Sequence, residues 1–257
     1  MSAALRVVKA TKRFGGVAAI SDVTLEVADG SLTALIGPNG AGKTTLFNLV
    51  TNLFPPTAGE IFFYDTCLNR LSPGQIAARG LIRTFQTARV FPAMTVLENV
   101  LVGGHRHIRR HAGEQMLWLA SARREERELT ARADAFLDLA GLAWLRDEPA
   151  TDLPMGSQKV LEVVRALMAR PRLLLLDEPA AGLNDSETAE LGSLLRAVRD
   201  SGVTVMVVEH NMSLVMGVAD QVLVLDAGTL VASGAPEEIR QNARVIEAYV
   251  GQKEAPV

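Results

Sequence analysis

The chain has 257 residues and a formal net charge of −3, and 48% of its residues are hydrophobic. This length allows one or two domains, the mild acidity argues against a nucleic-acid-binding surface as the main function, and the single Cys67 excludes an intrachain disulfide. No apolar run approaches the ~20 residues of a membrane-spanning helix, and the sequence opens without a signal-peptide core, so we expect a cytosolic protein that reaches any membrane through a partner.

The N-terminal third of the chain alternates between short strands and helices around a glycine-rich loop. Alternating apolar residues predict strands in the first thirty positions, and short apolar runs predict further strands downstream. In chain order the expected elements are strands at 7–10, 19–27 and 32–36, a helix at 44–50, a strand at 61–64, a helix from Pro73 and a strand at 81–86.

Residues 88–158 differ from the rest, because few strand signals occur among them. Thr95 and Glu98 form a capping-box pattern, in which each side chain accepts from the backbone N–H of the other residue. The charged segment 121–138 carries apolar residues at helical spacing. We therefore expect an inserted helical part here.

Apolar strands return after residue 160 and are separated by helices. They are expected at 173–176, 203–208 and 222–225. Strands interleaved with helices predict an α/β fold with a mainly parallel sheet, to which the N-terminal strands add an antiparallel part.

One stretch matches the phosphate-binding pattern G-x-x-x-x-G-K-[ST], and it stands between an expected strand and an expected helix. Glycines let the backbone wrap closely around a polyphosphate, so that its N–H groups point at the oxygens. Lys43 adds a positive charge for the β and γ phosphates, and Thr44 can ligate Mg²⁺, while the helix N-terminus attracts the same anion. We expect a P-loop NTPase (RecA-like) core that binds a nucleoside triphosphate through Gly37, Pro38, Asn39, Gly40, Ala41, Gly42, Lys43, Thr44 and Thr45.

The apolar strand at 173–176 ends in two carboxylates, Asp177 and Glu178. Four leucines suit a strand that is buried on both faces, which places Asp177 at the carboxyl edge of the sheet beside the phosphate loop. There Asp177 can hold Mg²⁺ directly or through a water. Glu178 is expected to point differently and to polarise the attacking water. The alternative is a solvated acidic turn.

The segment between these two motifs resembles a family signature. Residues 153–158, Leu-Pro-Met-Gly-Ser-Gln, and the helix after them resemble the signature L-S-G-G-Q of ATP-binding cassette (ABC) proteins. Pro154 replaces a serine whose hydroxyl would donate to the γ-phosphate, Ser157 stands where glutamine is usual, and Asn184 replaces an aspartate of the dimer-contact loop. We expect these departures to change the rate of ATP hydrolysis and not the family to which the chain belongs, because backbone N–H groups at the helix N-terminus remain available to the phosphate.

The resemblance implies roles for three further residues. Phe14 matches the aromatic residue that stacks on adenine, Gln86 the glutamine between nucleotide and membrane partner, and His210 the histidine that senses the γ-phosphate. From the residues alone, Phe14 also fits a core aromatic residue, Gln86 a polar strand end and His210 a surface histidine.

The resemblance also implies ATP and Mg²⁺ as cofactors. It assigns the metal to Thr44, Gln86 and Asp177, and catalysis to Glu178, His210 and Lys43. A partner subunit would contribute its own signature residues in trans, at Met155, Gly156, Ser157 and Gln158.

The expected organisation is a single ABC ATPase domain, 1–257. It has a core subdomain at 1–87 and 159–235, a helical subdomain at 88–158, and a C-terminal helix and tail at 236–257.

Several stretches look like bacterial uptake ATPases for branched-chain and related hydrophobic amino acids. This implies a second ATPase subunit, two transmembrane permease subunits and an external substrate-binding protein as partners, no nucleic acid, and a place at the cytoplasmic face of the inner membrane. No residue of this subunit would contact the substrate, so the substrate follows from the resemblance alone. The stretches are 83–86, 91–100, 177–184, 209–216 and 245–251.

Three other functions stay open at this point. One is the ATPase of an exporter, for example of lipopolysaccharide, and another is a soluble cassette ATPase in translation or DNA repair, although the single cassette and the acidic charge count against the latter. The third is a nucleotide-binding regulator without turnover. His105, His107 and His111 invite a metal site, but the arginines among them favour a solvated or partner-facing loop.

Overall fold

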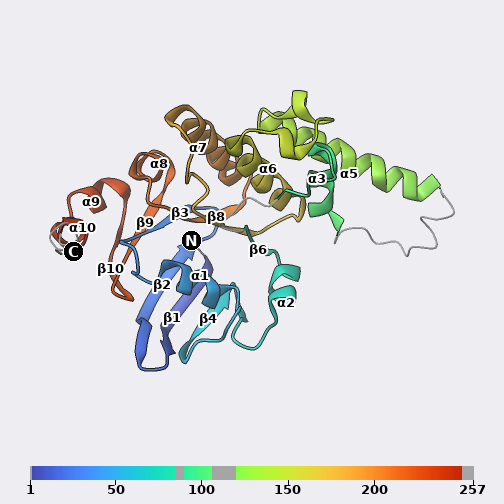
Figure 1. Cartoon of the computed structure of the whole chain (residues 1–257). Helices are drawn as coiled ribbons and strands as arrows, with labels where there is room; N and C mark the ends of the chain where they lie inside the picture. Colours follow the sequence, from blue (N-terminus) through green and yellow to red (C-terminus); the bar gives the residue numbers. More distant parts are fainter. Residues whose placement is uncertain (1, 85–89, 106–119, 251–257) are drawn as a thin grey trace. The chain divides into compact units, whose positions relative to one another are not determined.

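The computed structural model describes residues 2–84, 90–105 and 120–250, and its contacts divide the chain into two compact units (Figure 1). The first unit comprises Met1–Arg83, Arg172–Ala181 and Thr188–Val257. The second comprises Thr84–Pro171 and Gly182–Glu187.

The first unit contains two sheets. The four-stranded sheet is antiparallel, and its spatial order is β2-β1-β4-β5. The strands alternate buried and exposed residues, as expected of a sheet with one solvated face. Their bounds are β1 Ala3–Phe14, β2 Val17–Ala28, β4 Ala58–Phe63 and β5 Thr66–Cys67.

The second sheet of this unit has six strands in the order β10-β9-β3-β8-β7-β6. All neighbours are parallel except β9 and β10. Every residue of the three central strands β3, β8 and β7 is buried, which explains their continuous apolar sequences. The strands are β3 Leu32–Ile36, β6 Leu81–Arg83, β7 Leu173–Asp177, β8 Thr204–Val208, β9 Gln221–Asp226 and β10 Thr229–Gly234.

Helices cover both faces of the six-stranded sheet. Figure 1 shows α1 with the antiparallel sheet on one face, and α7 and α8 on the other. Helix α2 begins with a capping box at Ser72 and Gln75. The helices that lie wholly or mainly in this unit are α1 Lys43–Val50, α2 Pro73–Ala78, α7 Asp185–Asp200, α8 Met212–Val218, α9 Pro236–Arg240 and α10 Ala243–Val250.

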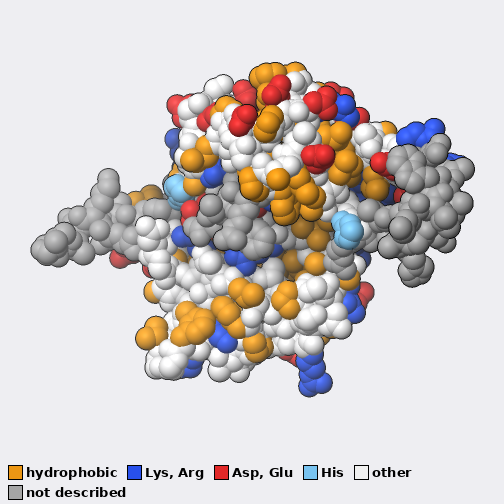
Figure 2. All heavy atoms as spheres, turned by 45° about the vertical axis from the view of Figure 1, so that its right-hand side comes forward, with side chains coloured by type: hydrophobic (Ala, Val, Ile, Leu, Met, Phe, Trp, Pro, Cys, Tyr) orange, Lys and Arg blue, Asp and Glu red, His pale blue; other side chains and the backbone are white. Residues whose placement is uncertain are grey.

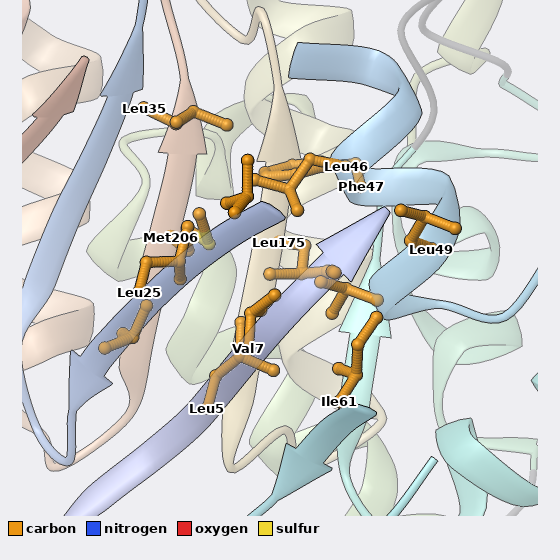
Figure 3. Close-up of a cluster of buried hydrophobic side chains, with 14 of the residues drawn as sticks. Leu5, Val7, Leu25, Leu35, Leu46, Phe47, Leu49, Ile61, Leu175 and Met206 are labelled. Carbon is orange, nitrogen blue, oxygen red and sulfur yellow. The ribbon is translucent and has the colours of Figure 1, made fainter. Parts of the chain in front are cut away.

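One hydrophobic cluster joins α1 to both sheets. Figure 3 shows Leu46 and Phe47 of α1 beside Val7 of the antiparallel sheet and Leu175 and Met206 of the parallel strands. All five side chains are buried completely. The helix that follows the phosphate loop is therefore fixed by packing on two sides.

The second unit is helical. Among its described residues the elements include α3 Val96–Gly103, α5 Ala120–Leu139, α6 Met155–Met168 and the short 3-10 helices η2 Ala143–Leu145 and η3 Ala150–Asp152. Helix α3 begins with the predicted capping box, since Thr95 Oγ1 accepts from Glu98 N and Glu98 Oε2 from Thr95 N. The apolar residues predicted on one face of α5 pack in the core of this unit, as Ala133 and Leu137 show.

The fold class and most elements are confirmed. The strand at 32–36 has the predicted bounds, and the helix predicted at 44–50 begins one residue earlier. The strand predicted at 81–86 ends at Arg83, one residue before the described part of the chain is interrupted, and β10 was not predicted. The predicted boundary after residue 158 falls inside α6, which packs on α3 and α5, so the contacts keep 159–171 with the helical unit.

Within the part of the chain that the structure describes, no helix is both long enough and apolar enough to cross a membrane.

The cluster around α1 leads to a stability prediction. Leu46→Ala removes a completely buried side chain and should lower the free energy of unfolding by about 2–5 kcal/mol, because a cavity is left between two sheets. Leu53→Ala is the matched control, since this leucine is 66% exposed and its loss should change stability by less than about 0.5 kcal/mol. Chemical denaturation measures both, and equal effects would contradict the packing described.

Candidate functional site

Strands β3, β7 and β8 end beside one another. Leu35 of β3 pairs with Val208 of β8, and Asp177, the last residue of β7, pairs with the same Val208. Parallel strands present their carboxyl ends at one edge of a sheet, where ligands of α/β proteins bind. The segments that meet at this edge are the phosphate loop 37–45 after β3, Glu178 after β7, and Glu209 and His210 after β8.

The phosphate loop has a backbone conformation that requires glycine at two positions. Gly37 has a φ of 149° and Gly42 a φ of 100°. A Cβ at Gly37 would collide with the carbonyl oxygen of Leu225, and a Cβ at Gly42 would lie 2.6 Å from the carbonyl oxygen of Ala19. Strands β9 and β2 therefore hold the loop so closely that a side chain has no room at either position.

Lys43 is buried inside this loop at the start of α1. Its Nζ donates to the carbonyl oxygen of Gly37 at 2.6 Å and to that of Pro38 at 2.9 Å. Burial lowers the pKa of the Lys43 ammonium from its ordinary value, and the carboxylates of Glu178 and Asp177 oppose this by raising it. The loop thus fixes a cation within electrostatic reach of both predicted carboxylates.

Asp177 is buried, and its two oxygens have different surroundings. Oδ2 accepts from Arg83 Nη2 at 2.8 Å, and Arg83 Nη1 donates to Asn48 Oδ1 at 2.6 Å. Oδ1 is equally buried but has no hydrogen-bond partner among the described residues. An unpaired buried carboxylate oxygen is rare and costly, so this atom marks a position for a cation or a water.

Glu178 follows directly with an unusual backbone. Its φ is 49°, in the left-handed region that residues other than glycine rarely adopt. Its N–H donates to the carbonyl oxygen of Val208 at 2.9 Å, and its carbonyl oxygen accepts from Ala181 N at 3.2 Å. The backbone thus turns sharply directly after β7, between Asp177 and Ala181.

His210 is exposed at the end of β8, and the buried residue before it was not predicted to matter. Glu209 Oε1 accepts from Ala180 N at 2.7 Å, while Oε2 accepts from the backbone N–H groups of His210 and Asn211 at 3.1 and 3.2 Å. The sequence did hold a signal for Glu209, because it is a carboxylate directly after an apolar strand, like Glu178. Arg83 and Asn48 were also missed, because their contacts join segments that are far apart in the sequence.

Phe14 lies at the end of β1 and is 49% exposed, so the core alternative for it is wrong. Its ring meets that of Phe54 edge to face at 5.3 Å between centroids, and Lys12 Nζ lies 4.7 Å from the centroid of the Phe54 ring. Figure 2 shows hydrophobic side chains reaching the surface in several places among polar ones. Phe14 is thus available for a ligand and oriented by a second aromatic ring.

The signature residues lie in the second unit, at the start of α6. Pro154 is the N-cap residue and provides no side-chain cap to the first turn. Met155 is 66% exposed and Ser157 is half-buried. The backbone N–H groups of this turn are therefore not capped by the side chain of the preceding residue.

Gly156 is buried where the signature turn meets the start of α7. A Cβ at this position would collide with the carboxylate of Glu187. The same carboxylate accepts from Asn184 N at 2.9 Å, and Asn184 Oδ1 accepts from Glu187 N at 3.0 Å. Gln158 Nε2 donates to the carbonyl oxygen of Leu153 at 2.9 Å, which closes the turn on its other side.

Gln86, His107 and His111 lie outside the described residues. Within the described ranges, no group of three or more His, Cys, Asp or Glu side chains is placed to hold a metal ion.

Comparison with protein families agrees with this arrangement. The model described as ABC transporter matches residues 20–181, and the one described as branched-chain amino acid ATP-binding cassette transporter matches residues 229–255. This chain belongs to the ABC transporter family. The predicted resemblance to its branched-chain amino acid branch is confirmed, and so is the prediction of a transport ATPase.

Two relatives are similar over nearly their full lengths. The high-affinity branched-chain amino acid transport ATP-binding protein LivG of Escherichia coli K12 is 44% identical over 241 residues, which are 93% of this chain and 94% of LivG. BraF of Pseudomonas aeruginosa, of the same description, is 42% identical over 243 residues, which are 94% of this chain and 95% of BraF.

Solved structures show the same fold. The ADP conformation of MJ1267, an ATP-binding cassette of an ABC transporter, is 29% identical with a TM-score of 0.84 and covers 98% of this chain and 100% of its own. The dimeric cassette MJ0796 in a post-hydrolysis state with ADP and Pi is 25% identical with a TM-score of 0.75, and covers 90% and 98%.

The backbone of Glu178 leads to a second prediction. Glu178→Gly should be more stable than Glu178→Ala by about 1 kcal/mol, because only glycine adopts a φ of 49° without strain. Glu190, in the interior of helix α7, is the matched control, since there alanine should be more stable than glycine by about 1 kcal/mol. Chemical denaturation of the four variants decides, and the same order of stability at both positions would contradict the left-handed turn.

Proposed function

We propose that this chain is the ATP-binding and ATP-hydrolysing subunit of an importer for branched-chain or related hydrophobic amino acids. The observation that carries the proposal is the 44% identity to LivG over 93% of the chain. The family match at residues 229–255 supports the same branch at the C-terminal end.

The phosphate loop would bind the ATP phosphates. Its two required glycines bring the backbone close to the ligand, and the N-terminus of α1 adds N–H groups and a partial positive charge. Lys43 supplies the fixed cation for the β and γ phosphates. The exposed ring of Phe14, held edge-on by Phe54, would stack on the adenine.

Mg²⁺ would be held beside the phosphates by Thr44 and Asp177. The donor set fits, because Asp177 Oδ1 is a buried carboxylate oxygen without a partner among the described residues and oxygens are the ligands that Mg²⁺ prefers. Gln86 remains the predicted third protein ligand. Bound Mg²⁺ would neutralise the negative charge on the phosphate oxygens.

Glu178 would orient the attacking water and accept its proton. The water oxygen attacks the γ-phosphorus, the bond from that phosphorus to the bridging oxygen breaks, and ADP leaves with that oxygen. His210, exposed at the end of β8, would contact the γ-phosphate from the same edge of the sheet. Both residues follow strands that end in register.

A second ATPase subunit would complete each site through its signature turn. Met155, Gly156, Ser157 and Gln158 would approach the γ-phosphate held by the partner. The dimeric structure of the MJ0796 cassette supports pairing of two such subunits. Because Pro154 has no hydroxyl, backbone N–H groups at the start of α6 would be the donors.

The remaining partners follow from the same assignment. Two transmembrane permease subunits and an external substrate-binding protein would complete the importer, with this chain at the cytoplasmic face of a bacterial inner membrane. The helical subdomain proposed from the sequence would then contact the permeases.

Glu178→Gln tests the proposal. We expect this variant to abolish ATP turnover and, in cells that depend on it, the uptake of labelled leucine, isoleucine and valine, because the amide cannot accept the proton of the attacking water. ATP should still bind and hold the subunits together as a dimer. A phosphate-release assay, size-exclusion chromatography and uptake measurements report the three results.

Glu26→Gln is the matched control, because this exposed carboxylate lies on β2, and it should leave turnover and uptake unchanged. Turnover of Glu178→Gln at the wild-type rate would contradict the role of Glu178. Normal amino acid uptake in cells without this chain would contradict the importer assignment and leave the ATPase chemistry intact.

A further inference from the structure

We propose that Glu209 is a positioning residue that ties the loop of Glu178 to the loop of His210, so that both groups reach ATP as one unit. The inference rests on the proposed function for the roles of Glu178 and His210. The hydrogen bonds that form the tie are present in the chain without nucleotide, so the tie can be tested without ATP.

The tie consists of three hydrogen bonds to one buried carboxylate. Glu209 is completely buried at the end of β8. Its Oε1 accepts from Ala180 N at 2.7 Å in the loop after β7, and its Oε2 accepts from His210 N and Asn211 N in the loop after β8. Hydrogen bonds to a charged acceptor are stronger than neutral ones, and burial strengthens them further.

The loop after β7 needs this support because its backbone is strained. Glu178 has a φ of 49° and is held on one side by the bond from its N–H to Val208 O. Two residues later, the bond from Ala180 N to Glu209 holds the other side. The left-handed turn is thus fixed to β8 at both ends, and the direction of the Glu178 side chain depends on it.

A carboxylate is the side chain that suits this position. An amide has one accepting oxygen, while its NH₂ group is a donor that would oppose a backbone N–H. Glutamine could therefore satisfy one loop but not both. Because catalytic groups must be held to a fraction of an ångström, release of either loop should reduce catalysis more than nucleotide binding, which depends on the phosphate loop.

The experiment measures ATP turnover and amide hydrogen exchange of the full chain with Glu209→Gln. We expect kcat to fall about tenfold or more while KM for ATP changes less than about twofold, as for a lost positioning contact. In the nucleotide-free chain, exchange should accelerate at Ala180, or at His210 and Asn211, according to which loop the amide oxygen keeps.

Glu209→Asp separates the two loops and serves if the glutamine variant does not fold. Its charge is kept but its reach is one methylene shorter, so it should keep the bonds to His210 N and Asn211 N and release Ala180 N. Asp220→Asn is the matched control, because Asp220 is also a carboxylate that accepts from a backbone N–H. Its Oδ2 accepts from Leu32 N at a distance of 2.8 Å, and neither residue belongs to the two loops. It should leave kcat and the exchange of all three amides unchanged.

Unchanged exchange at these amides in both Glu209 variants would overturn the tie. A kcat that stays at the wild-type value although the amides are released would overturn the positioning role. A wild-type chain without ATP turnover would count against the proposed function instead, while hydrogen exchange would still decide whether Glu209 joins the loops.

Discussion

The buried charge of Asp177 is the constraint on which the site depends. An ionised carboxylate inside a protein is unfavourable unless it is paired. Arg83 pairs with only one of its oxygens, Oδ2, and the other is left without a described partner. Burial lowers the pKa of Lys43, and the charges of Glu178 and Asp177 lie close enough to oppose this lowering. A bound cation at this edge of the sheet would therefore pair with the remaining oxygen of Asp177, Oδ1.

Several features at this edge are unfavourable on their own and persist because the surrounding core is well packed. Glu178 has a left-handed backbone, Lys43 is buried, and Asp177 Oδ1 is unpaired. The parallel strands that carry these residues are buried throughout, and α1 is packed between two sheets. Strain of this kind is typical of functional sites, where a rigid scaffold holds residues in conformations that they would not adopt on their own.

The sequence predicted the parts of the site that local pattern determines. The phosphate loop, the strand at 32–36 and the carboxylates after 173–176 could be read from residue types and spacing. Contacts between distant segments could not, because they depend on register: Arg83 reaches Asp177 across neighbouring strands, and Glu209 reaches Ala180 in another loop. Strand β10 was missed because it pairs antiparallel at the edge of the sheet, where burial is only partial and the apolar pattern is weak.

The most direct test of this account is the affinity of the ATP-bound chain for Mn²⁺, measured by its paramagnetic signal as a stand-in for Mg²⁺, in wild type and Asp177→Asn. If Asp177 Oδ1 is a metal ligand, the substitution should weaken metal binding about tenfold or more. The affinity for ATP without metal should not fall, because a negative charge near the phosphates is removed. Equal metal affinity in the two chains would contradict the assignment of this oxygen to a bound cation.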